Sequence, residues 1–84
     1  MKITVDVKTP DVLGKVIQQM RMQNGVSQRE LANRLGFGQK WLWNIEQGNT
    51  ILALSRLFQI FNELNLRLFM ELDVKDVNDE QPHR

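Results

Sequence analysis

The stretch RMQNGVSQRELANRLGFGQKWLWNIEQGNT, residues 21–50, decides the fold of this chain. Ser27 is followed three residues later by Glu30, which is the spacing of a capping box at the start of a helix. This helix is expected to cover residues 28–35, and after a glycine-containing turn a third helix is expected from Gln39 to Gln47. Two short helices joined by a tight turn predict a helix-turn-helix, whose second helix can enter the major groove of DNA.

Two elements are expected before this stretch. Apolar and polar residues alternate over residues 2–8, which predicts a short N-terminal strand. Thr9 and Pro10 then supply an N-cap and a proline in the first turn of a helix. This first helix should end near residues 23–24, because Gly25 suits a left-handed C-terminal cap.

Two further elements are expected after it. A fourth helix, capped by Asn49 or Thr50, is expected to end near Asn65, where the apolar period changes from that of a helix to that of a strand. The apolar residues expected to face the core are Leu13, Val16, Ile17 and Met20 in the first helix, Leu31, Ala32 and Leu35 in the second, and Leu54, Leu57, Phe58, Phe61 and Leu64 in the fourth.

Residues 66–74 predict a strand, and a lone strand leaves both edges open for pairing. Its partner is either the N-terminal strand of the same chain or the same strand of a second subunit across a two-fold axis. The side chains expected to support dimerisation are Leu66, Leu68, Met70, Leu72 and Val74.

The composition describes one small domain. The chain has 84 residues, 42% of them hydrophobic, and no cysteine, so we expect a modest core without disulfides or thiolate metal sites. It has neither the plan of a signal peptide nor an apolar run long enough to span a membrane, so we expect a cytoplasmic protein. The expected organisation is a strand at 1–8, a helix-turn-helix domain at 9–65, a dimerising strand at 66–74 and a disordered acidic tail at 75–84.

The charge is unevenly distributed along the chain. Residues 12–69 carry seven basic and three acidic side chains, whereas residues 70–84 carry two basic and five acidic ones. This asymmetry fits a phosphate-facing body with an acidic tail, and ordinary surface charge for solubility explains it equally well. The sequence has one histidine, His83, and no glycine-rich phosphate loop, so we expect no enzymatic activity, metal or cofactor.

Residues 13–64 resemble the lambda-repressor-like (Xre-type) family of helix-turn-helix domains. The resemblance rests on Gly25, Ser27, Gln28, Leu31, Ala32, Leu35, Gly36, Leu42, Ile45, Glu46 and Gly48. It implies a mainly α fold, with a bundle of four to five helices, and binding of double-stranded operator DNA. With the two predicted strands, the expected fold is this bundle plus a small sheet at a dimer interface.

The resemblance also implies residue roles. Gln39, Lys40 and Asn44 occupy positions where the family contacts base edges, and these side chain types suit adenine and guanine. Gln28 would span a phosphate and the recognition helix. Further phosphate contacts would be Ser27, Arg29 and Asn49, although for Arg29 and Asn49 a solvated surface position is an equally good interpretation.

Other positions have a structural role or depart from the family pattern. The resemblance pairs Arg21 with Glu46 as a partly buried ion pair. Trp41 and Trp43 stand where the family usually has small or polar side chains. Trp43 is expected nearer to the DNA-facing side, and three roles remain open for it: contact with DNA, contact with a second subunit or partner protein, or filling of a local gap.

The order of elements around FQIFNELNL and RLFMELDV, residues 58–74, resembles the HipB-type antitoxins, whose C-terminal strands pair across a dimer. This resemblance implies a homodimeric repressor of its own operon that binds a HipA-like serine/threonine kinase toxin and lies on the nucleoid when bound to DNA. Two alternatives remain open. One is a stand-alone phage-type repressor, and the other is a protein-interaction adaptor on a helix-turn-helix scaffold.

Overall fold

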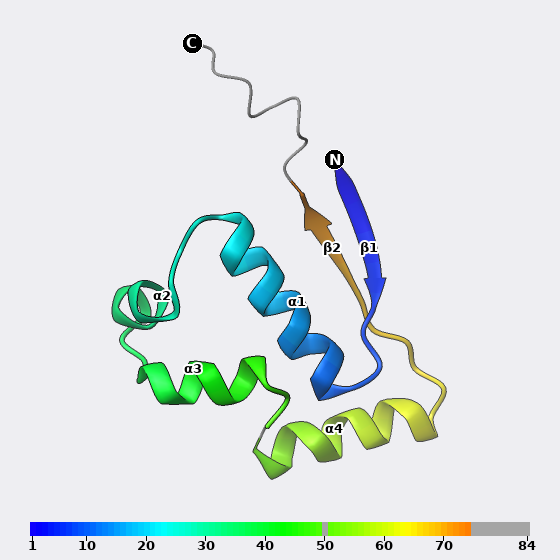
Figure 1. Cartoon of the computed structure of the whole chain (residues 1–84). Helices are drawn as coiled ribbons and strands as arrows, with labels where there is room; N and C mark the ends of the chain where they lie inside the picture. Colours follow the sequence, from blue (N-terminus) through cyan, green and yellow to red (C-terminus); the bar gives the residue numbers. More distant parts are fainter. Residues whose placement is uncertain (50, 75–84) are drawn as a thin grey trace.

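The computed structural model of the chain describes residues 1–49 and 51–74. Its elements are β1 (Lys2–Asp6), α1 (Pro10–Gln23), α2 (Gln28–Leu35), α3 (Gln39–Glu46), α4 (Leu52–Glu63) and β2 (Phe69–Asp73) (Figure 1). The described part is thus mainly helical with a small antiparallel sheet, which confirms the expected fold class. The acidic tail expected at residues 75–84 lies outside the described residues.

Local sequence signals explain the bounds of α1 and α2. The Thr9 hydroxyl accepts a hydrogen bond from the Val12 N–H at 3.2 Å, and Pro10 is the first residue of α1. Ser27 caps α2, which ends before Gly36. Gly36 has a φ of 78°, a left-handed conformation that costs glycine little and permits the sharp turn into α3.

The start of α4 differs from the expected one. Its N-cap is Ile51, which makes no side-chain capping bond, so the expected cap at Asn49 or Thr50 is wrong. Asn49 instead belongs to the end of α3, where its N–H donates to the Asn44 carbonyl oxygen at 2.9 Å, and α4 begins only at Leu52. Thr50 lies outside the described residues.

The buried apolar side chains come from α1, α2, α3 and α4 and from the segment after β1. They are Val7, Val16, Ala32, Leu42 and Phe58. Leu35, Leu57 and Leu64 are exposed, contrary to expectation. In α4 the inward side carries Phe58 with the half-buried Leu54 and Phe61, and Leu35 is the last residue of α2. The core therefore uses a narrower face of the helices than the apolar pattern predicted.

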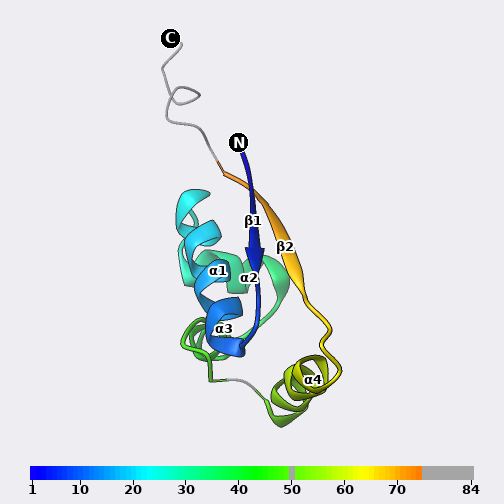
Figure 2. The same cartoon turned by 90° about the vertical axis from the view of Figure 1, so that its right-hand side faces the viewer.

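The sheet pairs the two ends of the described chain. β1 and β2 are antiparallel, with Val5 opposite Met70 and Ile3 opposite Leu72, so the N-terminal strand pairs within the chain. Figures 1 and 2 show the strands side by side next to α1, with α4 at the opposite end of the molecule from the N-terminus.

The C-terminal strand is shorter than predicted. β2 covers Phe69–Asp73, whereas residues 66–74 were expected to form it. Leu66 lies in the connection from α4, while Leu68 accepts a backbone hydrogen bond from Val7 at 2.8 Å. Met70 and Leu72 are half-buried while their neighbours in β2 are exposed, so one face of this strand is already partly covered within the chain.

Candidate nucleic-acid interface

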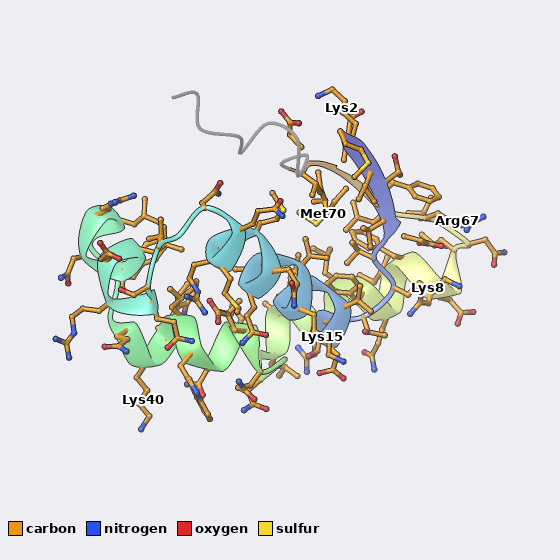
Figure 3. All side chains as sticks on the ribbon, turned by 45° about the horizontal axis from the view of Figure 1, so that its top comes forward. Lys2, Lys8, Lys15, Lys40, Arg67 and Met70 are labelled. Atoms are coloured by element: carbon orange, nitrogen blue, oxygen red, sulfur yellow. The ribbon has the colours of Figure 1, made fainter. Side chains whose placement is uncertain are left out.

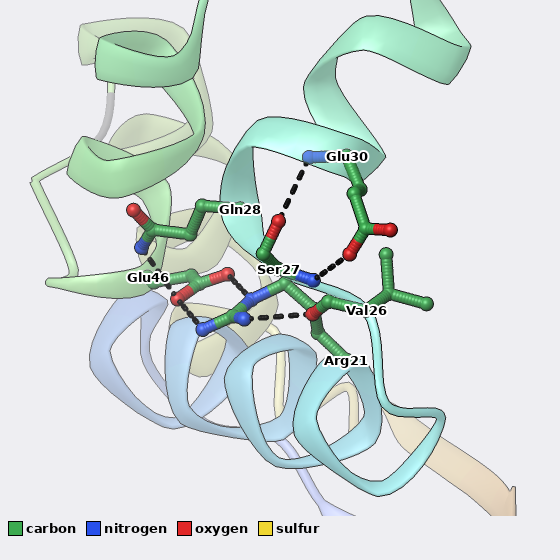
Figure 4. A network of polar contacts seen from close by, with 6 residues as sticks. All are labelled: Arg21, Val26, Ser27, Gln28, Glu30 and Glu46. Atoms are coloured by element: carbon green, nitrogen blue, oxygen red, sulfur yellow. Dashed lines mark hydrogen bonds and ion pairs between the residues drawn. The ribbon is translucent and has the colours of Figure 1, made fainter.

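The end of α3 is fixed by a buried ion pair. The Glu46 side chain is fully buried, and Arg21, at the end of α1, is nearly so. The Arg21 guanidinium donates from Nε to Glu46 Oε2 at 2.7 Å and from Nη2 to Glu46 Oε1 at 3.1 Å (Figure 4). Its Nη1 donates to the Val26 carbonyl oxygen at 2.9 Å, which ties in the loop before α2. Such two-point pairing fixes both distance and orientation.

Gln28 adds α2 to the same carboxylate. Its Nε2 donates to Glu46 Oε1 at 2.9 Å, so one side chain holds groups from α1 and α2 against α3. Burial raises the pKa of Glu46, but the hydrogen bonds from Arg21 and then Gln28, with the Arg21 charge, outweigh it and leave this pKa below its usual value. Glu46 is therefore ionised at neutral pH, as the pairing with Arg21 requires.

A capping box orders the start of α2. The Glu30 N–H donates to Ser27 Oγ at 3.0 Å, and the Ser27 N–H donates to Glu30 Oε1 at 2.9 Å. Both bonds lower the pKa of Glu30, and the bond donated by the Ser27 backbone N–H has the larger effect. Ser27 and Arg29 are both exposed at this end of the helix, where backbone N–H groups favour an anion.

Gly14 lets α1 and α3 approach closely, and the sequence interpretation missed it. A Cβ on Gly14 would lie 2.9 Å from the Glu46 carbonyl oxygen and closer still to that of Ile45. The one available signal was a glycine in the interior of a predicted helix, which often marks a packing requirement. The contact sets the distance between α1 and the recognition helix.

The outward face of α3 carries two of the three residues expected at base edges. Leu42 and Glu46 point inward, and at about 100° per residue Lys40 and Asn44 point the opposite way. Gln39 and Lys40 are exposed in the first turn, and Lys40 extends away from the other helices (Figure 3). Asn44 is half-buried.

Asn44 and Asn49 meet at a shallow hollow of about 290 Å³ beside α3, together with Trp41, Ile45 and Ile51. Trp41 was not assigned to the site from the sequence, although its position three residues before Asn44 places both on one side of a helix. Trp43 does not line this hollow, and the two tryptophans are 49% and 46% exposed. The structure therefore places Trp41, more closely than Trp43, with the predicted DNA-contacting residues.

Metal sites and membrane-spanning helices are both absent from the described parts of the chain. Residues 1–49 and 51–74 contain no cluster of histidine and acidic side chains arranged to hold a metal ion. The same residues form no helix that is both long and apolar enough to cross a bilayer.

Comparison with known proteins identifies the family. Residues 12–60 match a helix-turn-helix domain family. Over 74 residues the chain is 30% identical to the antitoxin HipB of Escherichia coli K12 and to the antitoxin HipB of Escherichia coli O6:H1 strain CFT073. Each alignment covers 88% of this chain, and it covers 83% of the K12 protein and 78% of the CFT073 protein. No solved structure matches the chain. The predicted resemblance is thus confirmed, and the chain belongs to the Xre-type helix-turn-helix family of DNA-binding proteins, with HipB antitoxins among its relatives.

Proposed function

We propose that the chain is a non-enzymatic, sequence-specific repressor that binds operator DNA as a homodimer and serves as the antitoxin of a module whose operon it represses. The observation that carries this proposal is the clamp on α3, in which Arg21 and Gln28 both bind Glu46. That clamp fixes the backbone of α3, so the helix that carries Lys40 and Asn44 needs no rearrangement before it binds. A preorganised backbone of this kind loses less entropy on binding.

The proposed contacts divide into two groups. Gln39, Lys40 and Asn44 read base edges, since their amide and ammonium groups match acceptors and donors in the major groove. The phosphate contacts are Ser27, Gln28, Arg29 and Asn49, with Trp43 against the sugar-phosphate backbone. One N–H of the Gln28 amide binds Glu46, and the second is the donor for a phosphate.

Exposed apolar side chains on α4 support the homodimer. Leu57, Ile60 and Leu64 are 44%, 50% and 62% exposed, and their spacing of three and four residues places them on one stripe of the helix. The stripe continues into the exposed Leu66 and Leu68 of the connection to β2. An apolar surface of this kind marks an interaction site in a soluble domain.

The charges beside this stripe suit a second copy of the same chain. Arg56 and Glu63 are exposed and seven residues apart, so they lie on the same flank of α4. In a two-fold dimer with antiparallel α4 helices, Arg56 of each copy faces Glu63 of the other, as an isologous interface requires. The proposed interface comprises the α4 stripe and the segment with Leu66, Leu68, Met70, Leu72 and Val74.

The test of DNA binding uses a duplex selected by the chain from a random library, with Kd measured by fluorescence anisotropy at several salt concentrations. If Arg29 of both subunits neutralises two phosphates, log K should fall with log salt at a slope of about −1.8. A scrambled duplex is the control and should bind more weakly. Failure to select any duplex would favour the protein-interaction adaptor instead.

The proposed toxin is a HipA-like serine/threonine kinase. The two named relatives are antitoxins, and this similarity supports the assignment. The test is co-expression of the chain with its neighbouring open reading frame, followed by affinity purification and mass spectrometry. A kinase-like protein should co-purify; if a selected duplex binds but no kinase does, the chain is a stand-alone repressor. In either case repression would take place on the cytoplasmic nucleoid.

A further inference from the structure

Trp41 is a large apolar side chain held in a fixed position next to the proposed base-reading groups. Its indole is 49% exposed and packs edge-on against the Phe37 ring, with centroids 5.0 Å apart and planes at 61°. Edge-to-face pairs of this geometry are favourable, so Phe37 restricts the orientation of the indole. Trp41 therefore presents an ordered apolar surface rather than a freely rotating one.

The hollow beside Trp41 combines apolar walls with amide groups. Trp41 and the exposed Ile51 both line it, together with Asn44 and Asn49. The amides suit base edges and phosphates, whereas the indole and the isoleucine need an apolar partner. In the major groove the apolar group that a base edge offers is the C5 methyl of a pyrimidine, which thymine carries.

We propose that Trp41, with Ile51, is a specificity determinant that packs against the C5 methyl group of a pyrimidine. Trp41 and Asn44 are three residues apart, or about 4.5 Å along the helix, close to the roughly 3.4 Å between successive base pairs. The methyl group therefore belongs to the base pair next to the one that Asn44 reads. This inference rests on the proposed function, since it requires α3 to lie in the major groove.

The experiment removes the methyl group without changing base pairing. In a duplex selected by the wild-type chain, each thymine of one half-site is replaced in turn by deoxyuridine, and Kd is measured by fluorescence anisotropy at constant salt. Burial of one methyl group corresponds to about fourfold in affinity, so one position should weaken binding by about that factor. At that position, a duplex with a 5-methylcytosine–guanine pair should bind more tightly than one with a cytosine–guanine pair by the same factor. The reason is that 5-methylcytosine carries the same C5 methyl group as thymine.

Trp41→Ala should abolish the methyl effect, so that thymine and deoxyuridine duplexes bind alike. Trp41→Phe should keep part of it, and it also serves if Trp41→Ala fails to fold. Trp43→Ala should keep the fourfold ratio whatever its effect on affinity, because Trp43 does not line the hollow.

Two results would overturn the inference alone: a selected duplex with no methyl-sensitive thymine, or Trp41→Ala retaining the wild-type ratio. Failure of the wild-type chain to bind any selected duplex would overturn the proposed function together with this inference.

Discussion

Gly14 of α1 lies directly against the backbone of Glu46 in α3, because a Cβ on Gly14 would lie 2.9 Å from the Glu46 carbonyl oxygen. Both contacting groups are backbone atoms, one in the interior of α1 and the other at the last residue of α3, so rotation of a side chain cannot relieve the contact. The same Glu46 receives the Arg21 guanidinium at its side chain. The close approach at Gly14 is therefore a condition for the ion pair that orients α3.

Gly14→Ala should destabilise the fold although alanine is the better helix former. Alanine gains about 1 kcal/mol from helix propensity, but overpacking in a rigid contact costs about 1–3 kcal/mol. With two carbonyl oxygens in the way we expect a net loss of about 1–2 kcal/mol, measured by urea unfolding. Gln19→Ala, at an exposed position of the same helix, is the control and should change stability by less than about 0.5 kcal/mol. Equal stability of Gly14→Ala and the wild type would contradict the close contact.

Glu46→Gln should lower the free energy of unfolding at pH 7 by about 2–4 kcal/mol, because it leaves Arg21 buried without a counter-charge. The loss should depend on pH. The folded-state pKa of Glu46 lies below its ordinary value of 4.5, so the unfolded state takes up the proton first on acidification. The stabilisation is then complete above pH 4.5 and is lost as the pH falls through the folded-state pKa.

The wild type and Glu46→Gln should therefore converge in stability below pH 4.5, which urea unfolding at a series of pH values will test. Glu71→Gln, in the exposed part of β2, is the matched control and should change stability by less than about 0.5 kcal/mol. A gap between the wild type and Glu46→Gln that stays constant down to pH 3 would exclude this role for the Glu46 charge.

Gln39→Ala and Asn44→Ala should each weaken binding to a selected duplex by about 1–3 kcal/mol and leave the thermal midpoint nearly unchanged, because neither side chain is part of the buried core. Anisotropy titration and circular dichroism provide the two measurements. Gln59→Ala, on the exposed side of α4, should bind as the wild type does. If both variants kept full affinity, the assignment of base contacts would be wrong.

Arg56→Glu and Glu63→Arg should each weaken the homodimer, and the double variant should restore it. Each swap replaces two symmetric attractive pairs by repulsive ones, so we expect a loss of about 1–2 kcal/mol per variant, or about fivefold to thirtyfold in dimer Kd. Sedimentation equilibrium measures this directly. Asn62→Glu, at an exposed position of the same helix on the side away from the stripe, controls for charge alone.

If the double variant dimerised no more tightly than the single variants, the antiparallel arrangement of the α4 helices would be excluded. If all variants remained dimeric, the interface would lie at the strand segment without α4.

The helix bounds were predictable wherever local chemistry sets them. The capping box at Ser27 and Glu30 fixed the start of α2, and Thr9 with Pro10 fixed that of α1, since these signals act within one turn. The start of α4 was not predictable from capping preference, because its N-cap is Ile51, which has no side-chain oxygen to cap the helix. Only the path of the chain after α3 determines this.

Residues whose role depends on tertiary distance were harder to predict. Arg21 and Glu46 were paired through the family resemblance, and the structure contains that ion pair. Gly14 and Trp41 were missed because a close helix contact and a shared hollow are properties of packing between elements. Leu57 and Leu64 fit a helical stripe, yet which stripe is inward depends on the angle at which α4 docks.

The antiparallel pairing of β1 with β2 constrains the order of events during synthesis. Val5 pairs with Met70, and at about 5–20 residues per second Met70 is added to the chain roughly 3 to 13 s after Val5. The helices between them depend on local contacts that form far faster than this. A nascent chain thus completes its recognition helix while β1 still waits for its partner strand, and the sheet is the last part of the molecule to close.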